Sequence, residues 1–205
     1  YVVLQGNTGA GKTKILKELK NRGYDILDLE GCANHRGSFL GSVGIGNCNS
    51  QKTFESLMYN QLKDRNSNLV FVEGESKRIG NVLIPNYIYD KMIKSDRILI
   101  NTSLDTRAKN IVDEYTVSKD WKDEVVKGLN NLKKYISEKE ISTYISMLED
   151  NKTKEVVKDL MENYYDPMYK KGQDKYEYVF NIESDDINIV CDEIENWIKK
   201  HSEHK

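Results

Sequence analysis

One eight-residue stretch near the start of the chain restricts the possible folds more than any other feature. Residues 6–13 read GNTGAGKT; the apolar run YVVLQ precedes them and the helical pattern KILKELKNRG follows. The octet fits the pattern G-x-x-x-x-G-K-[ST] at every fixed position, with a strand expected before it and a helix after it. It therefore predicts a P-loop, whose backbone N–H groups and helix N-terminus together bind an anion.

The P-loop predicts a site for a di- or triphosphate with Mg²⁺. The residues expected to bind the phosphates are Gly6, Asn7, Thr8, Gly9, Ala10, Gly11, Lys12 and Thr13. The glycines let the backbone turn tightly and approach an anion with no Cβ in the way. Lys12 is expected to bring its charge to the terminal phosphate oxygens, and the Thr13 hydroxyl is expected to bind Mg²⁺.

Apolar runs alternate with amphipathic patterns along the chain. Strands are expected at 1–5, 25–29, 68–73, 97–102 and 177–182, and helices at 12–22, 50–64, 86–95, 104–117 and 185–201. This alternation predicts an α/β fold of the P-loop NTPase type, a doubly wound and mainly five-stranded parallel sheet with helices on both faces.

Residues 119–171 interrupt the alternation with helical spacing alone, so we expect a helical insertion between the fourth and fifth strands. One domain is expected overall, with a P-loop α/β core at 1–118 and a final strand and helix at 172–205. The insertion is expected to pack on the edge of the sheet, with a substrate lid or partner-binding arm as the alternative.

Composition excludes several classes of protein. The formal net charge is −2, so the totals show no generally basic surface, although Lys and Arg number 31. No apolar run approaches the ~18 residues of a transmembrane helix, so no membrane partner is expected.

The cysteines, Cys32, Cys48 and Cys191, are odd in number and widely spaced. They favour a reducing, cytoplasmic location over a disulfide framework, and with His35 they match zinc-site spacing poorly.

Carboxylates follow the third expected strand, where a P-loop site needs an acidic group. The run LVFVE ends at Glu73, and Glu75 follows two residues later. Glu73 stands where an aspartate is usual, and we expect it to reach Mg²⁺ through water or to act as a base. A surface carboxylate at a strand end is the alternative.

The segment DLEGCANHRGSFLGSVGIGN (28–47) follows the second strand, at the sheet edge where open α/β folds bind ligands. Arg36 is expected to clamp an anion, and His35 to transfer a proton or hydrogen-bond a substrate. Each residue alone is more often a surface group. The apolar residues Phe39, Leu40, Val43 and Ile45 either form an apolar pocket for part of a ligand or pack within the loop.

Four blocks occur in order: GNTGAGKT, DLEGCANHRGS, QKTFE and VEGESKRIG. Together they resemble the P-loop domain of tRNA 2-selenouridine synthase, closely over residues 1 to about 115 and weakly beyond. The resemblance implies a transferase module in an enzyme that replaces sulfur by selenium at position 2 of the wobble uridine of tRNA. It also implies selenophosphate as the selenium donor and a geranylated intermediate made from geranyl diphosphate.

The resemblance further implies a rhodanese-like partner domain that carries a catalytic cysteine. The P-loop begins at residue 6, so we expect either an excised module or the separately encoded half of a split enzyme. The ligand of the P-loop is left open between ATP, GTP and geranyl diphosphate, because the loop recognises phosphates alone.

Carried onto this sequence, the family pattern implies catalytic roles for Glu73, His35 and Arg36. It adds Glu75 and Arg78 to the phosphate-binding residues, and it implies that Thr13 and Glu73 hold Mg²⁺. Arg107 is a further candidate for a phosphate contact, although a surface ion pair is the more usual role for such a residue.

For tRNA, the Lys-rich helices expected at 119–139 and 152–175 are candidates, with five tyrosines for base stacking. Solvated helix faces with core tyrosines are the more usual arrangement. A small-molecule or nucleotide kinase is the main alternative function, but residues 119–171 contain no Arg to clamp a phosphoryl group. A nucleotide-binding regulatory subunit is the alternative outside the enzymes.

Overall fold

The computed structural model describes residues 1–38 and 40–202. Its central sheet has five parallel strands in the order β2-β3-β1-β6-β7. They are β1 Val2–Gln5, β2 Asp25–Leu27, β3 Val70–Glu73, β6 Asp96–Asn101 and β7 Phe180–Glu183. This sheet confirms the predicted α/β fold of the P-loop NTPase type.

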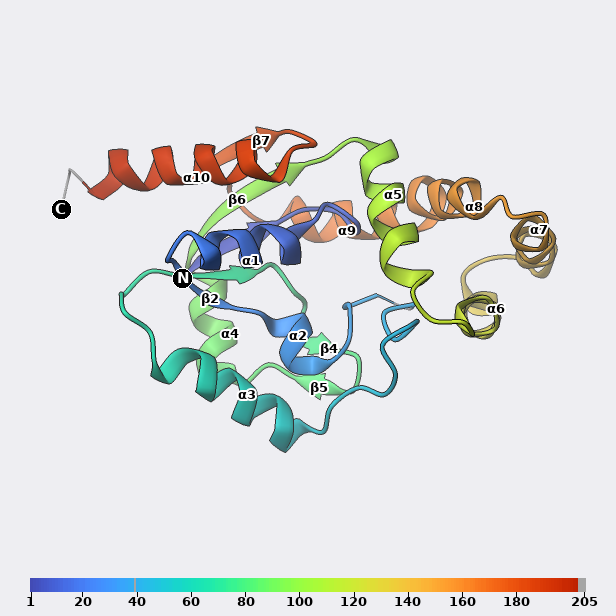
Figure 1. The fold of residues 1–205 in the computed structure, drawn as a ribbon, viewed down its shortest axis with the longest axis horizontal. Coiled ribbons are helices and arrows are strands. Elements are labelled where there is room, and N and C mark those ends of the chain that lie inside the picture. The colour runs from blue at the N-terminus through green and yellow to red at the C-terminus, as the bar shows by residue number, and fades with distance from the viewer. Residues whose placement is uncertain (39, 203–205) are drawn as a thin grey trace.

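Helices cover both faces of the sheet (Figure 1). On one face, α1 (Lys12–Asn21) and α10 (Ile187–Ser202) bury an apolar cluster against Val2 and Leu4. On the other, α2 (Leu29–Ala33), α3 (Gln51–Lys63) and α4 (Asn86–Ile93) pack against Val3. Successive residues of β1 therefore face opposite layers, as the period of two in a strand requires, and its apolar run is buried on both sides.

The insertion forms a third apolar cluster of its own. After α5 (Leu104–Tyr115) come α6 (Trp121–Asn131), a 3₁₀ turn (Leu132–Lys134), α7 (Glu138–Glu149), α8 (Thr153–Leu160), a π-helical turn (Met161–Tyr165) and α9 (Asp166–Gln173). Figure 1 shows α6 and α7 standing away from the sheet, while α9 runs back behind it toward β7. Leu40 and Val43 pack into this cluster, so the 35–48 loop touches the insertion.

Several local features differ from the expectations, and the fifth strand, for example, begins at Phe180 and not at residue 177. The second strand ends at Leu27 and not at residue 29, because the Asp28 side chain accepts a hydrogen bond from the Gly31 N–H at 2.7 Å and caps α2. A small antiparallel hairpin, β4 (Arg78–Ile79) with β5 (Val82–Leu83), was not predicted. Two-residue strands are too short to show an alternating pattern.

Among the described residues, no helix combines the length and apolar character needed to cross a bilayer. Phe39, one of the apolar loop residues singled out above, lies outside the described residues.

Candidate phosphate site and its neighbouring cavities

The P-loop joins the end of β1 to the first turn of α1 and packs closely on neighbouring elements. Gly9 and Gly11 have φ of +77° and +81°, which suits glycine. A Cβ on Gly6 would lie 2.8 Å from the Ile100 carbonyl oxygen, and one on Gly9 would lie 2.7 Å from that of Arg107. Gly6 and Gly9 are therefore needed for packing on β6 and α5, in addition to any approach to an anion.

A small cavity of about 40 Å³ opens over this loop, and we call it the P-loop cavity. Residues 8–14 line it together with Glu30, Arg36, Ile111, Glu114, Tyr115 and Tyr169. The Lys12 ammonium group donates to the Gly6 carbonyl at 3.1 Å, so the lysine folds back over its own loop. The cavity thus gathers residues from the P-loop, α2, the 35–48 loop, α5 and α9.

Two carboxylates converge on the Thr13 hydroxyl. Its oxygen lies 2.8 Å from Oε1 of Glu73 and 3.1 Å from Oε2 of Glu30. The other Glu73 oxygen accepts from the backbone N–H groups of Leu29 and Glu30, at 3.0 and 3.3 Å. Glu73 has no exposed surface, so both of its oxygens are satisfied inside the protein.

Three neighbouring carboxyl groups, those of Glu30, Glu73 and Glu75, have raised pKa values. Burial raises the pKa of Glu73 well above its usual value, and the neighbouring Glu30 raises it further. Burial and the charge of Glu75 raise the pKa of Glu30 to about 8, and burial raises the pKa of Glu75. A hydroxyl and carboxylate oxygens are the ligands that Mg²⁺ prefers, so this donor set fits that ion.

Helices α5 and α9 support the P-loop from outside. Arg107, only 5% exposed, donates through Nε to the Thr8 carbonyl at 2.9 Å and pairs both terminal nitrogens with Asp166 at 2.6 and 2.9 Å. The Asn110 amide donates to the Gly9 carbonyl at 2.9 Å. The expectation of a surface ion pair at Arg107 is wrong, because the arginine is buried and its partner Asp166 is only partly exposed.

Arg36 lines the P-loop cavity, but its guanidinium group hydrogen-bonds to backbone carbonyls of the protein. Its terminal nitrogens donate to the carbonyls of Val43 and Glu114, at 2.5 and 3.1 Å. The guanidinium carbon lies 4.8 Å from the centroid of the Tyr115 ring. Arg36 therefore ties its own loop to the end of α5, and an anion clamp would require it to exchange these partners.

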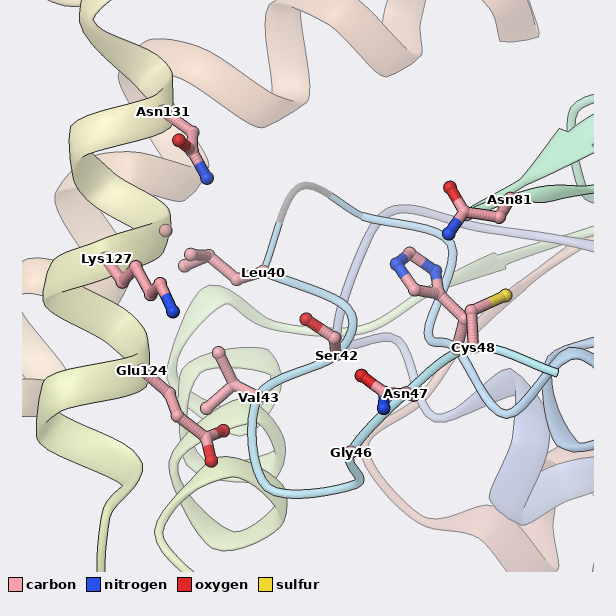
Figure 2. Close-up of a pocket in the computed structure, with 13 residues that line it drawn as sticks. Leu40, Ser42, Val43, Gly46, Asn47, Cys48, Asn81, Glu124, Lys127 and Asn131 are labelled. Carbon is pink, nitrogen blue, oxygen red and sulfur yellow. The ribbon is translucent and has the colours of Figure 1, made fainter.

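His35 lines a different cavity, of about 510 Å³, which we call the loop cavity. Figure 2 shows Glu124, Lys127 and Asn131 of α6 on one side of it and Asn47, Cys48 and Asn81 on the other. His35 Nδ1 accepts from the Gly37 N–H at 3.1 Å. Burial, and then the charge of Arg36, lower the pKa of His35, so the imidazole is neutral at neutral pH. The structure does not bring His35 to the P-loop cavity.

Glu75 lines a third cavity, of about 400 Å³, which we call the tyrosine cavity because Tyr89, Tyr165, Tyr169 and Tyr176 contribute to its walls. A Cβ on Gly37 would lie 2.6 Å from a Glu75 oxygen and 3.0 Å from a Glu30 oxygen, so the two carboxylates flank this glycine. Arg78 is exposed on β4 and is not among the described residues that line any of the three cavities.

The comparison with known families decides the relationship. The model of the tRNA 2-selenouridine synthase AAA domain matches residues 1–205. The chain belongs to this family. The resemblance predicted from the four sequence blocks is thereby confirmed.

Two tRNA 2-selenouridine synthases illustrate the relationship. The protein of Nitrosomonas eutropha is 37% identical over 121 residues, which cover 57% of this chain and 31% of that protein. The protein of Pseudomonas syringae pv. tomato is 30% identical over 197 residues, covering 82% and 52%. The chain thus spans about a third to a half of the curated relatives it matches. Among solved structures, deoxyadenosine kinase from M. mycoides aligns over 97% of this chain and 98% of that one, at 18% identity and a TM-score of 0.39.

Proposed function

We propose that this chain is the P-loop module of a tRNA 2-selenouridine synthase. It binds a nucleotide or a prenyl diphosphate with Mg²⁺ and contributes to tRNA binding. The complete system exchanges sulfur for selenium at the wobble uridine, through a geranylated intermediate and with selenophosphate as donor. A rhodanese-domain partner supplies the catalytic cysteine, and the reaction takes place in the cytoplasm.

The observation that carries this proposal is the contact of Thr13 with Glu73 and Glu30 directly beneath the P-loop. Lys12 and the loop N–H groups hold the phosphate oxygens, while Thr13 and Glu73 hold the metal. When bound, Mg²⁺ neutralises phosphate charge. Glu73 accepts hydrogen bonds from two backbone N–H groups, which favour its charged form. A fixed carboxylate of this kind suits a cation better than it suits proton abstraction, and Glu30 is a second acidic group beside it.

Calorimetry tests the phosphate site directly. Wild-type protein is titrated with ATP, GTP and geranyl diphosphate, each with MgCl₂, and compared with Lys12→Ala. Loss of a charged hydrogen-bond donor costs about 1.5–3 kcal/mol, so we expect affinity for the true ligand to fall roughly 10- to 150-fold. Lys17→Ala, an exposed lysine on the same helix, is the matched control and should leave affinity unchanged. Equal affinities in wild type and Lys12→Ala for all three ligands would show that the P-loop assignment is wrong.

Reconstitution tests the reaction. The chain is mixed with a rhodanese-domain protein, tRNA containing 2-thiouridine, geranyl diphosphate and selenophosphate, and the nucleosides are analysed by mass spectrometry. We expect 2-selenouridine only when this chain is present, and a strongly reduced yield with Lys12→Ala at limiting ligand concentration. Transfer of phosphate from ATP to a nucleoside in the absence of tRNA would instead favour the kinase alternative.

A further inference from the structure

The tyrosine cavity shares Tyr169 with the P-loop cavity, and Glu75 is the only one of the expected phosphate-binding residues that lines it among the described residues. One wall comes from the carboxyl ends of β1 and β3, through Gln5, Gly74 and Glu75, and the opposite wall from residues 165–176. Ligands bind at this edge of open α/β sheets. At about 400 Å³ the cavity falls within the roughly 300–1,000 Å³ of small-molecule sites.

Arg97 is the most unusual residue of this cavity. It is 5% exposed, and its guanidinium carbon lies 3.7 Å from the centroid of the Tyr176 ring. Its terminal nitrogens donate to Gln5 Oε1 at 3.1 Å and to the Met92 carbonyl at 3.0 Å. Among the described residues, its Nε has no hydrogen-bond partner. A buried N–H without an acceptor costs free energy, and a ligand carbonyl is one way to satisfy it.

The lining suits a flat polar ring. Tyrosine faces and a guanidinium plane stack on aromatic rings, while Gln5, Ser76 and the Glu75 carboxyl offer hydrogen bonds at the edges. An isoprenoid tail would cover the same polar groups without giving them partners, at a cost in free energy. The chemistry of the walls therefore favours a heteroaromatic base over a prenyl chain.

The position of the cavity connects it with the phosphate site. Tyr169 lines both cavities, and Glu75 and Glu30 both lie close to Gly37. Helix α9, which supplies Tyr169, also donates from Gln173 to the Asn7 side chain at 2.8 Å. Lys175 lines the cavity and is exposed, where it can meet a phosphate of a nucleic-acid strand.

We propose that the tyrosine cavity receives one unstacked nucleobase of a single-stranded RNA, beside the phosphate ligand held by the P-loop. The proposal rests on the tRNA-directed function above and states where on this chain the RNA base enters. The cavity tyrosines stack on the base, Arg97 donates to it through Nε, and Lys175 contacts the flanking phosphate.

Photo-cross-linking tests the location without any substitution. A single-stranded RNA heptamer with one central 5-iodouridine is irradiated with the full chain, and cross-linked peptides are identified by mass spectrometry. 5-Iodouracil cross-links to aromatic side chains stacked on it, so we expect adducts on peptides containing the cavity tyrosines. Adducts confined to other peptides, such as the 42–48 loop or α6, would overturn the proposal.

A pair of tyrosine variants tests the stacking. The heptamer with a fluorescent end label is titrated by anisotropy against Tyr176→Ala and Tyr87→Ala. Tyr87 is a suitable control because it is 68% exposed on α4 and does not line the cavity. Base–aromatic stacking contributes about 1–3 kcal/mol, so RNA affinity should fall by at least fivefold in Tyr176→Ala and stay within twofold in the control.

Calorimetry on the same variants separates this proposal from the proposed function. Binding of ATP and geranyl diphosphate should be unchanged by Tyr176→Ala. If Tyr176→Ala weakens geranyl diphosphate and not RNA, the cavity holds the prenyl tail and the proposal fails. If Lys12→Ala affects no phosphate ligand while the tyrosine adducts persist, the P-loop assignment fails and the base site stands.

Discussion

The P-loop cavity and the loop cavity are lined by consecutive residues, Arg36 and His35, yet they are built differently. The first is small and is held by buried charged contacts, among them those of Glu73 and of Arg107 with Asp166. The second is large, and the hydrogen bonds around it involve backbone groups, such as those from the Asn34 amide to the Ile45 and Asn47 carbonyls and from the Gly44 N–H to the Glu124 carboxylate. Neighbours in a motif therefore need not share a site, and of these two cavities only the first is lined by the P-loop.

The largest expected effect concerns the support of the P-loop cavity. Arg107→Ala should lower the free energy of unfolding by about 2–3 kcal/mol, because the partly buried Asp166 carboxylate and the Thr8 carbonyl lose their partner. Lys109→Ala is the control, since its exposed pair with Asp113 contributes at most about 0.5 kcal/mol. Urea unfolding of both variants gives the comparison, and equal losses would contradict the structural role assigned to Arg107.

The next effect separates stability from metal binding at Glu73. Glu73→Ala should cost about 2 kcal/mol, because two backbone N–H groups lose their acceptor. Glu73→Gln keeps an acceptor and resembles the protonated carboxyl, so its stability should stay within about 1 kcal/mol of wild type. Both should lose Mg²⁺-dependent phosphate binding in calorimetry. Full Mg²⁺-dependent binding by Glu73→Gln would show that this carboxylate does not hold the cation.

A smaller effect should appear in the pH dependence of the metal-free protein. The pKa values of Glu30, Glu73 and Glu75 are raised on folding, so the folded state binds more protons than the unfolded state above pH 4.5. Stability should therefore fall as pH rises from about 5 to about 8, where Glu30 titrates. Urea midpoints at several pH values, with and without MgCl₂, measure this fall, which added Mg²⁺ should reduce. Glu30→Gln should flatten the curve, and a stability that rises over this range would refute the charge arrangement.

The smallest effect tests the division between the two cavities. His35→Ala should leave affinity for the phosphate ligand within twofold, because His35 does not line the P-loop cavity. Arg36→Ala should weaken it by about fivefold, through loss of one cation and of the loop contacts to Val43 and Glu114. A large loss in His35→Ala with none in Arg36→Ala would reverse the assignment of the two residues.

The sheet and the position of the phosphate site could be predicted because their signals are local. An apolar run buried on both faces marks the central strands β1 and β3, and the octet at 6–13 with Glu73 at the end of β3 places Thr13 and that carboxylate together. The contact of Glu30 with Thr13 could not be predicted from a second strand that runs to residue 29. Glu30 reaches Thr13 because the strand ends at Leu27 and Asp28 caps helix α2. Asp166 and Tyr169 carry no such signal, because their contacts with the P-loop depend on how α9 packs.

The buried link from the Thr8 carbonyl through Arg107 to Asp166 has a consequence for synthesis of the chain. The P-loop leaves the ribosome before its outer supports, which follow about 100 and 160 residues later in the sequence. At roughly 5–20 residues per second, the loop waits many seconds for them. Contacts so distant in sequence form late and slow the folding of a domain. A phosphate ligand that binds early would thus favour the nascent P-loop conformation before α9 is made.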